Sequence, residues 1–154
     1  MNTNIKTNTA LKEVNDPVNI LQSVLTDLRK GKISDAVDTF DDQFTFIDHA
    51  LKLEFSDKER LREFFEKSNE LFPDIIVELI STFESGEHII AEWKISANRR
   101  QQYFGSELRI PISFAGASVV QIENGRITRW SDYYDSNKSW RFSLAAFFTE
   151  WIGI

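Results

Sequence analysis

The chain has 154 residues and a formal net charge of −6, with 42% hydrophobic and 27% charged residues, which is ordinary for one soluble globular domain. It contains no Cys and only two His, so disulfides, thiolate metal sites and a cysteine nucleophile are excluded, and no metal site is expected. The acidic balance argues against nucleic acid and anionic membranes as partners, and no apolar run approaches the ~20 residues of a membrane span.

The N-terminal residues predict a loose arm and then a helix. Residues 1–15 are polar, and the absence of an apolar signal core among the first ten predicts a cytoplasmic protein. Asp16 and Pro17 fit an N-cap and the first helical position. Apolar residues recur at helical spacing over 18–28, and Gly31 is the expected end of the helix.

A short second helix and a first strand are expected next. Ser34 is the predicted N-cap of a helix that runs towards Phe40. Residues 43–49 alternate in polarity, which is typical of a strand. One face of this strand carries Phe44, Phe46 and Asp48.

The third helix is expected to lie between residues 56 and 73. Ser56 and Glu59 fit a capping box at its start, and Pro73 ends it. Residues 75–80 then alternate as a strand does.

The remainder of the chain predicts antiparallel strands. Residues 87–98 alternate cleanly between apolar and polar positions, which predicts one buried and one wet face. Residues 99–106 are expected to be a polar loop. Residues 107–122 are expected to form a long strand that is bent or bulged near Gly116.

The last strand follows a strong turn signal. Asn124 and Gly125 predict a tight hairpin, and residues 126–135 predict the strand. One of its faces carries Thr128, Trp130, Asp132 and Tyr134. Residues 139–152 are rich in aromatic side chains and predict a C-terminal helix.

The order of these elements predicts the fold class. Helices come first and a meander of strands follows, which indicates an α+β fold with the helices on one face of a curved sheet. A curved sheet closed on one face by helices forms a cone. Such a cone can hold a ligand, and the high aromatic content, 13%, is consistent with apolar walls.

Two carboxylates are the candidate chemical groups. Asp48 and Asp132 fall on strand faces that also carry aromatic side chains. Burial there would raise their pKa values towards those useful for proton transfer, and a pair in different surroundings can divide acid and base roles. The alternative is structural: Asp48 bonds turn amides at its strand end, and Asp132 pairs with Arg129, Arg126 or a backbone donor.

The sequence at residues 120–135, VQIENGRITRWSDYYD, resembles the closing hairpin of SnoaL-like proteins in the nuclear transport factor 2-like superfamily. Residues 40–48 resemble the first strand of the same family, and with the helix order the resemblance covers most of 16–136. It implies a cone-shaped α+β domain, a curved mixed or antiparallel sheet with N-terminal helices on its concave face. The domain is expected at 16–138, with the aromatic segment 139–154 after it.

Within this superfamily the hairpin is most similar to that of limonene-epoxide hydrolase. Asp132 falls on that family's last-strand Asp, and Asp48 falls on a water-positioning Asn. The Arg-x-Asp of its middle strand is absent, because Trp93 and Ile95 stand at those positions. Polyketide cyclases of the superfamily place an acid/base Asp near Asp132, and ketosteroid isomerases place a base near Asp48.

The expected function is binding of a small, largely apolar molecule, with Asp132 and Asp48 moving a proton in an isomerisation, cyclisation or hydration. No cofactor is required. Tyr134 or Trp130 would donate a hydrogen bond to a substrate oxygen. The apolar walls would include Phe44, Phe46, Trp93 and Ile95.

Two further expectations concern partners. The alternative to an enzyme is a non-catalytic domain that binds an apolar ligand or serves in association. In either case a homodimer is expected through the open face of the sheet, by resemblance to the family and because Ile76 and Ile80 leave that face partly apolar.

Overall fold

The first helix begins where Asp16 and Pro17 predict it. We describe residues 16–135 from a computed structural model, in which helix α2 spans Pro17–Arg29. The Asp16 carboxylate accepts a hydrogen bond from the Val18 amide at 3.2 Å, and Pro17 occupies the first helical position. Gly31 follows the helix with φ +71°, the left-handed conformation that terminates helices. The predicted helix is confirmed.

The next two helices are found, but both predicted N-caps are wrong. Helix α3 (Ile33–Asp38) begins one residue before Ser34 and has no side-chain cap. Helix α4 (Lys58–Leu71) is capped by Asp57, whose carboxylate accepts from the Arg60 amide at 3.0 Å. The cap must reach an amide two or three residues into the helix. Asp57 has that spacing, and Ser56 precedes it.

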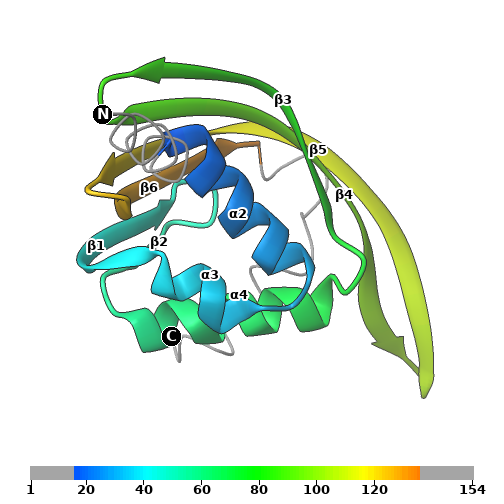
Figure 1. Cartoon of the computed structure of the whole chain (residues 1–154). Helices are drawn as coiled ribbons and strands as arrows, with labels where there is room; N and C mark the ends of the chain where they lie inside the picture. Colours follow the sequence, from blue (N-terminus) through cyan, green and yellow to red (C-terminus); the bar gives the residue numbers. More distant parts are fainter. Residues whose placement is uncertain (1–15, 136–154) are drawn as a thin grey trace, which may run out of the picture.

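The strands form one curved, open sheet in the order β2-β1-β6-β5-β4-β3, with α2, α3 and α4 on its concave side (Figure 1). Its strands are β1 (Phe40–Asp48), β2 (Leu53–Phe55), β3 (Ile76–Ser85), β4 (His88–Tyr103), β5 (Ser106–Glu123) and β6 (Arg126–Tyr134). The pair β1–β6 is parallel and the others are antiparallel, so the sheet is mixed. The expected α+β class and helix-covered curved sheet are confirmed, whereas β2 was not predicted.

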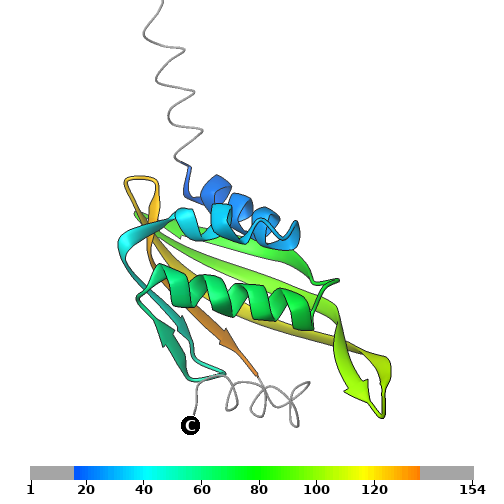
Figure 2. The same cartoon turned by 90° about the horizontal axis from the view of Figure 1, so that it is seen from below.

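Residues 99–106 are not the polar loop that was expected. They belong to a long β4–β5 hairpin, which pairs Arg100 with Arg109 and turns at Phe104 and Gly105. The hairpin tip projects past the end of α4 (Figure 2). Strands there have no helix to cover them, so polar residues suit both faces. Arg100 and Glu107 form an ion pair of 3.3 Å across the two strands.

Gly116 does not mark a bulge, because the β4–β5 ladder runs through it without interruption. The irregularity of β5 lies between Gln121 and Ile122, where its register with β6 shifts. A Cβ on Gly116 would lie 2.5 Å from the Trp93 indole. Glycine therefore makes room for Trp93 against the sheet.

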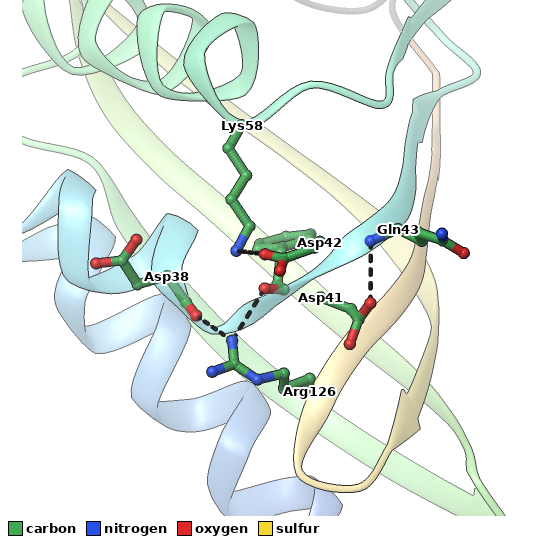
Figure 3. Close-up of polar contacts among 7 residues, drawn as sticks. Asp38, Asp41, Asp42, Gln43, Lys58 and Arg126 are labelled. Carbon is green, nitrogen blue, oxygen red and sulfur yellow. Dashed lines mark hydrogen bonds and ion pairs between the residues drawn. The ribbon is translucent and has the colours of Figure 1, made fainter.

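Polar contacts beside the turn of the last hairpin join it to α3 and β1, and a further contact joins β1 to α4 (Figure 3). Arg126 donates from Nη1 to the carbonyl oxygen of Asp38 at 3.0 Å, which ties the start of β6 to the end of α3. Lys58 binds the Asp42 carboxylate at 3.0 Å, which ties the start of α4 to β1. The parallel β1–β6 pair is thereby joined to both helices.

No helix within residues 16–135 is long and apolar enough to cross a membrane. The arm predicted at 1–15 and the aromatic helix predicted at 139–152 lie outside the described residues.

Candidate active site

The parallel pairing of β1 with β6 places the two candidate carboxylates side by side. Asp48 is in register with Asp132, and the His49 amide donates to the Asp132 carbonyl at 3.0 Å. Both side chains line one cavity of about 190 Å³ between the helices and the sheet. An apolar cavity of ~150 Å³ already holds a benzene-sized molecule, so this one admits a small ligand.

The cavity wall is mostly apolar. The predicted wall residues Phe46, Trp93, Ile95, Trp130 and Tyr134 line it, together with leucines of α2, phenylalanines of α4 and Phe114 of β5. Phe44 does not. Phe44 lies two residues before Phe46 on β1, and its ring centroid is 5.2 Å from that of Phe40. It therefore belongs to the hydrophobic core and not to the cavity wall.

The Asp132 carboxyl is held by two donors. Ser118 donates from Oγ at 2.5 Å and Trp130 donates from Nε1 at 2.6 Å, and both reach the same oxygen, Oδ1. No hydrogen bond from the described residues reaches Oδ2. Burial raises the pKa of Asp132 from 3.8 to about 7, the two donors oppose the rise, and the charge of Asp48 adds to it. Near neutral pH this group both gives and takes a proton.

Ser118 is itself oriented by a third side chain. It lies directly across from Asp132 in the β5–β6 register, and Trp93 donates from Nε1 to its Oγ at 2.8 Å. The hydroxyl proton is therefore left to point at Asp132. Sequence reasoning missed this role for Ser118, although a small polar residue at an inward position of a buried strand was a signal for it.

Asp48 accepts a hydrogen bond from a turn amide, as the structural alternative expected, and it also lines the cavity. Its Oδ1 accepts from the Leu51 amide of the following turn at 2.8 Å, and its Oδ2 accepts from the Tyr134 hydroxyl at 2.8 Å. Burial is the largest influence and raises the pKa of Asp48, while these hydrogen bonds lower it. Burial and the Asp48 carboxylate raise the pKa of Tyr134 well above 10.

The charged partners expected for Asp132 are not found. Asp132 pairs with neither Arg129, which donates to Ser131, nor Arg126, which binds carbonyl oxygens near α3. Tyr134 and Trp130 were expected to donate to a substrate oxygen. Each has a single polar hydrogen, and those hydrogens go to Asp48 and Asp132.

Among residues 16–135 no group of His, Asp and Glu side chains is arranged to hold a metal ion. The polar chemistry of the cavity therefore centres on two neighbouring carboxylates in different surroundings. Asp48 has both oxygens hydrogen-bonded, whereas one oxygen of Asp132 accepts no hydrogen bond from the described residues.

Comparison with known proteins gives a family match. Residues 21–130 match the family model described as SnoaL-like domain, which is more than half of the chain. None of the curated proteins matches.

Solved structures with the same fold include three of different description. A protein from Catenulispora acidiphila with a ketosteroid isomerase-like fold, in complex with trimethylamine, is 16% identical, with a TM-score of 0.67 over 75% of this chain and 85% of that one. A proposed SnoaL-like polyketide cyclase from Shewanella denitrificans is 14% identical, with a TM-score of 0.70 over 79% and 91%. An LEH-like epoxide hydrolase from M. tuberculosis is 13% identical, with a TM-score of 0.66 over 90% and 96%. At these identities the likeness establishes the fold.

Proposed function

Because the chain belongs to the SnoaL-like domain family, we propose that it binds a small, largely apolar molecule in the cavity and catalyses a proton transfer on it. Asp132 is the acid/base group. The observation that carries this proposal is that Asp132, a carboxyl with a pKa of about 7, lines an apolar cavity and has an oxygen, Oδ2, that accepts no hydrogen bond from the described residues. A pKa near the working pH is what general acid/base catalysis requires.

The two carboxylates have separate roles in this proposal. Asp48 is bound by the Leu51 amide and the Tyr134 hydroxyl, so it acts as a fixed neighbouring charge that helps to keep Asp132 protonated. Asp132 exchanges the proton. Isomerisation, cyclisation and water addition are compatible with one such group beside a polarised carbon–oxygen bond.

The expected effect of Asp132→Asn is a loss of turnover with the fold retained. General acid/base catalysis contributes ~10²–10⁴-fold, so turnover should fall by at least about 100-fold. A substrate is first found in a panel of β,γ-unsaturated ketones, terpene epoxides and polyketide-like β-diketones. Ser131→Ala, a change at a buried neighbour on the opposite face of β6, is the matched control. Turnover by Asp132→Asn equal to that of Ser131→Ala would exclude Asp132 from the mechanism.

A second candidate function is non-catalytic ligand binding. It is favoured by the observation that Trp130 donates its hydrogen bond to Asp132 and Tyr134 donates its hydrogen bond to Asp48. A developing substrate oxyanion would then depend on Asp132 alone. Saturable binding of an apolar probe without turnover of any panel member would select this alternative.

A further inference from the structure

On the side of the cavity formed by the strands, which we call the strand side, the Trp93, Ser118, Trp130 and Tyr134 donors are all engaged in hydrogen bonds within the protein. The Trp93 indole N–H goes to Ser118, and the Ser118 hydroxyl goes to Asp132. The N–H of Trp130 and the hydroxyl of Tyr134 also end on the carboxylates. Each of these side chains has one polar hydrogen to give. A ligand on this side therefore meets acceptors, above all Asp132 Oδ2.

The two carboxylates also lack a salt bridge within residues 16–135. Among the described residues, neither Asp48 nor Asp132 forms an ion pair with a Lys, Arg or His side chain. The other polar groups with donors that line the cavity come from the helices: Arg29 at the end of α2, and Ser68 and Asn69 on α4. Ser68 donates to the carbonyl oxygen of Phe64. No ion pair within the described residues therefore offsets the negative charge of these two carboxylates.

Aromatic rings stand beside these carboxylates. Trp93, Phe114 and Tyr134 form a cluster with ring centroids 5.1–5.9 Å apart, and all three line the cavity. Aromatic faces attract cations, and the attraction strengthens when water is excluded. An anionic ligand group would be repelled by the carboxylates, and among the side chains of the described strands that line the cavity a neutral acceptor group would find a donor only in protonated Asp132.

From these contacts we propose that the ligand is a small apolar amine bound as its ammonium ion, with the cation between Asp132 Oδ2 and the aromatic cluster of Trp93, Phe114 and Tyr134. This deepens the proposed function, on which it rests, by naming the class of molecule that the cavity takes. The ammonium group supplies both the missing positive charge and the missing donors.

The binding has a defined pH dependence. The titratable groups that line the cavity with Asp132 are Asp48 from β1, Tyr134 from β6 and Arg29 from α2. Tyr134 has a raised pKa and stays neutral. As pH rises through 7, Asp132 becomes an anion, and the affinity for an ammonium ion that stays protonated increases.

A matched ligand series tests the proposal. Cyclohexylmethylamine, cyclohexylmethanol and cyclohexanecarboxylate share a ring and differ in the polar group. Calorimetric titration at pH 8 and physiological salt should give at least tenfold tighter binding of the amine than of the alcohol, and no binding of the carboxylate. Between pH 6 and pH 8 the amine affinity should rise, and the alcohol affinity should not.

Variants locate the effect. Asp132→Asn should reduce the amine affinity to that of the alcohol. Asp41→Asn should leave the preference intact, because it removes the same charge from a side chain that bonds the Gln43 amide outside the cavity. Equal affinities for amine and alcohol in the wild-type chain would overturn the proposal even if Asp132→Asn failed to fold. If the amine and the alcohol bound with equal affinity, the proposed function would still stand, because the cavity would still bind a small apolar molecule. Absence of binding by all three ligands would overturn both.

Discussion

A carboxyl group among aromatic rings prefers its neutral form, because the cavity solvates a charge poorly. At Asp132 this preference is only partly offset by the Ser118 and Trp130 donors, and the result is a pKa of about 7. The residue is thus suited to proton exchange, and its ionised form costs stability.

The first prediction concerns this stability. Asp132 has a pKa of about 7 in the folded chain and 3.8 as the reference value. Between these values the native state holds a proton that the unfolded state has released, so stability falls as pH rises from about 4 to 7. The ionised group should cost about 4 kcal/mol at pH 8, as an upper figure. Asp132→Asn cannot ionise there.

Thermal unfolding of the two proteins at pH 4 and pH 8 checks this prediction. Asp132→Asn should be the more stable protein at pH 8 and should differ little from wild type at pH 4. An equal difference at both pH values would mean that Asp132 does not carry the raised pKa.

At the residue scale, strand alternation was enough to predict that Asp48 and Asp132 share an apolar hollow. It was not enough to predict their partners. Ser118 contacts Asp132 because β5 and β6 pair in one register, and that register is shifted near Gln121. Alternation within one strand does not specify which residues of the neighbouring strand lie opposite.

At the scale of single elements, local sequence signals predicted that the helices exist, but they did not predict the residue at which α3 and α4 begin. Asp57 caps α4 although Ser56 also fits a capping pattern. Both residues are exposed, so a difference in stability between their alanine variants reports the loss of the cap and not a loss of burial. Asp57→Ala should lower the free energy of unfolding by about 1 kcal/mol, and Ser56→Ala should change it by less than about 0.5 kcal/mol. Urea unfolding measures both, and the reverse order would restore Ser56 as the cap.

One strand and the outer part of a hairpin were missed by the sequence prediction, for physical reasons. β2 has three residues, too few for alternation to be recognised. The outer part of the β4–β5 hairpin is polar because it extends beyond the helices, so no hydrophobic pattern marks it (Figure 2). The longer elements that bury a face against the helices were predicted, whereas the short β2, which also buries Leu53 and Phe55, was not.

At the scale of the whole molecule, the convex face of the sheet carries large apolar side chains. Ile80 is 61% exposed, Phe83 60% and Ile76 57%, and Ile90 and Tyr133 extend the surface across β4 and β6. The helices cover the opposite face, so no element within residues 16–135 covers this apolar surface. We propose that a second copy of the chain covers it, as expected from the sequence.

Sedimentation velocity at micromolar concentration checks the dimer. The wild-type chain should sediment as a dimer, and Phe83→Glu should sediment as a monomer because it places a charge in the apolar surface. Glu63→Lys changes a charge at an exposed position of α4, on the helix-covered side of the sheet, and serves as the control. A wild-type chain that is monomeric throughout would contradict the proposed dimer.

The whole account of the site depends on the protonation of one side chain. Carbon-13 NMR of the aspartate carboxyl groups measures it directly, with the Asp132 signal assigned by its absence in Asp132→Asn. The expected result is a titration midpoint near 7 for Asp132. A midpoint near 4, like that of an exposed aspartate, would contradict the proposed acid/base role.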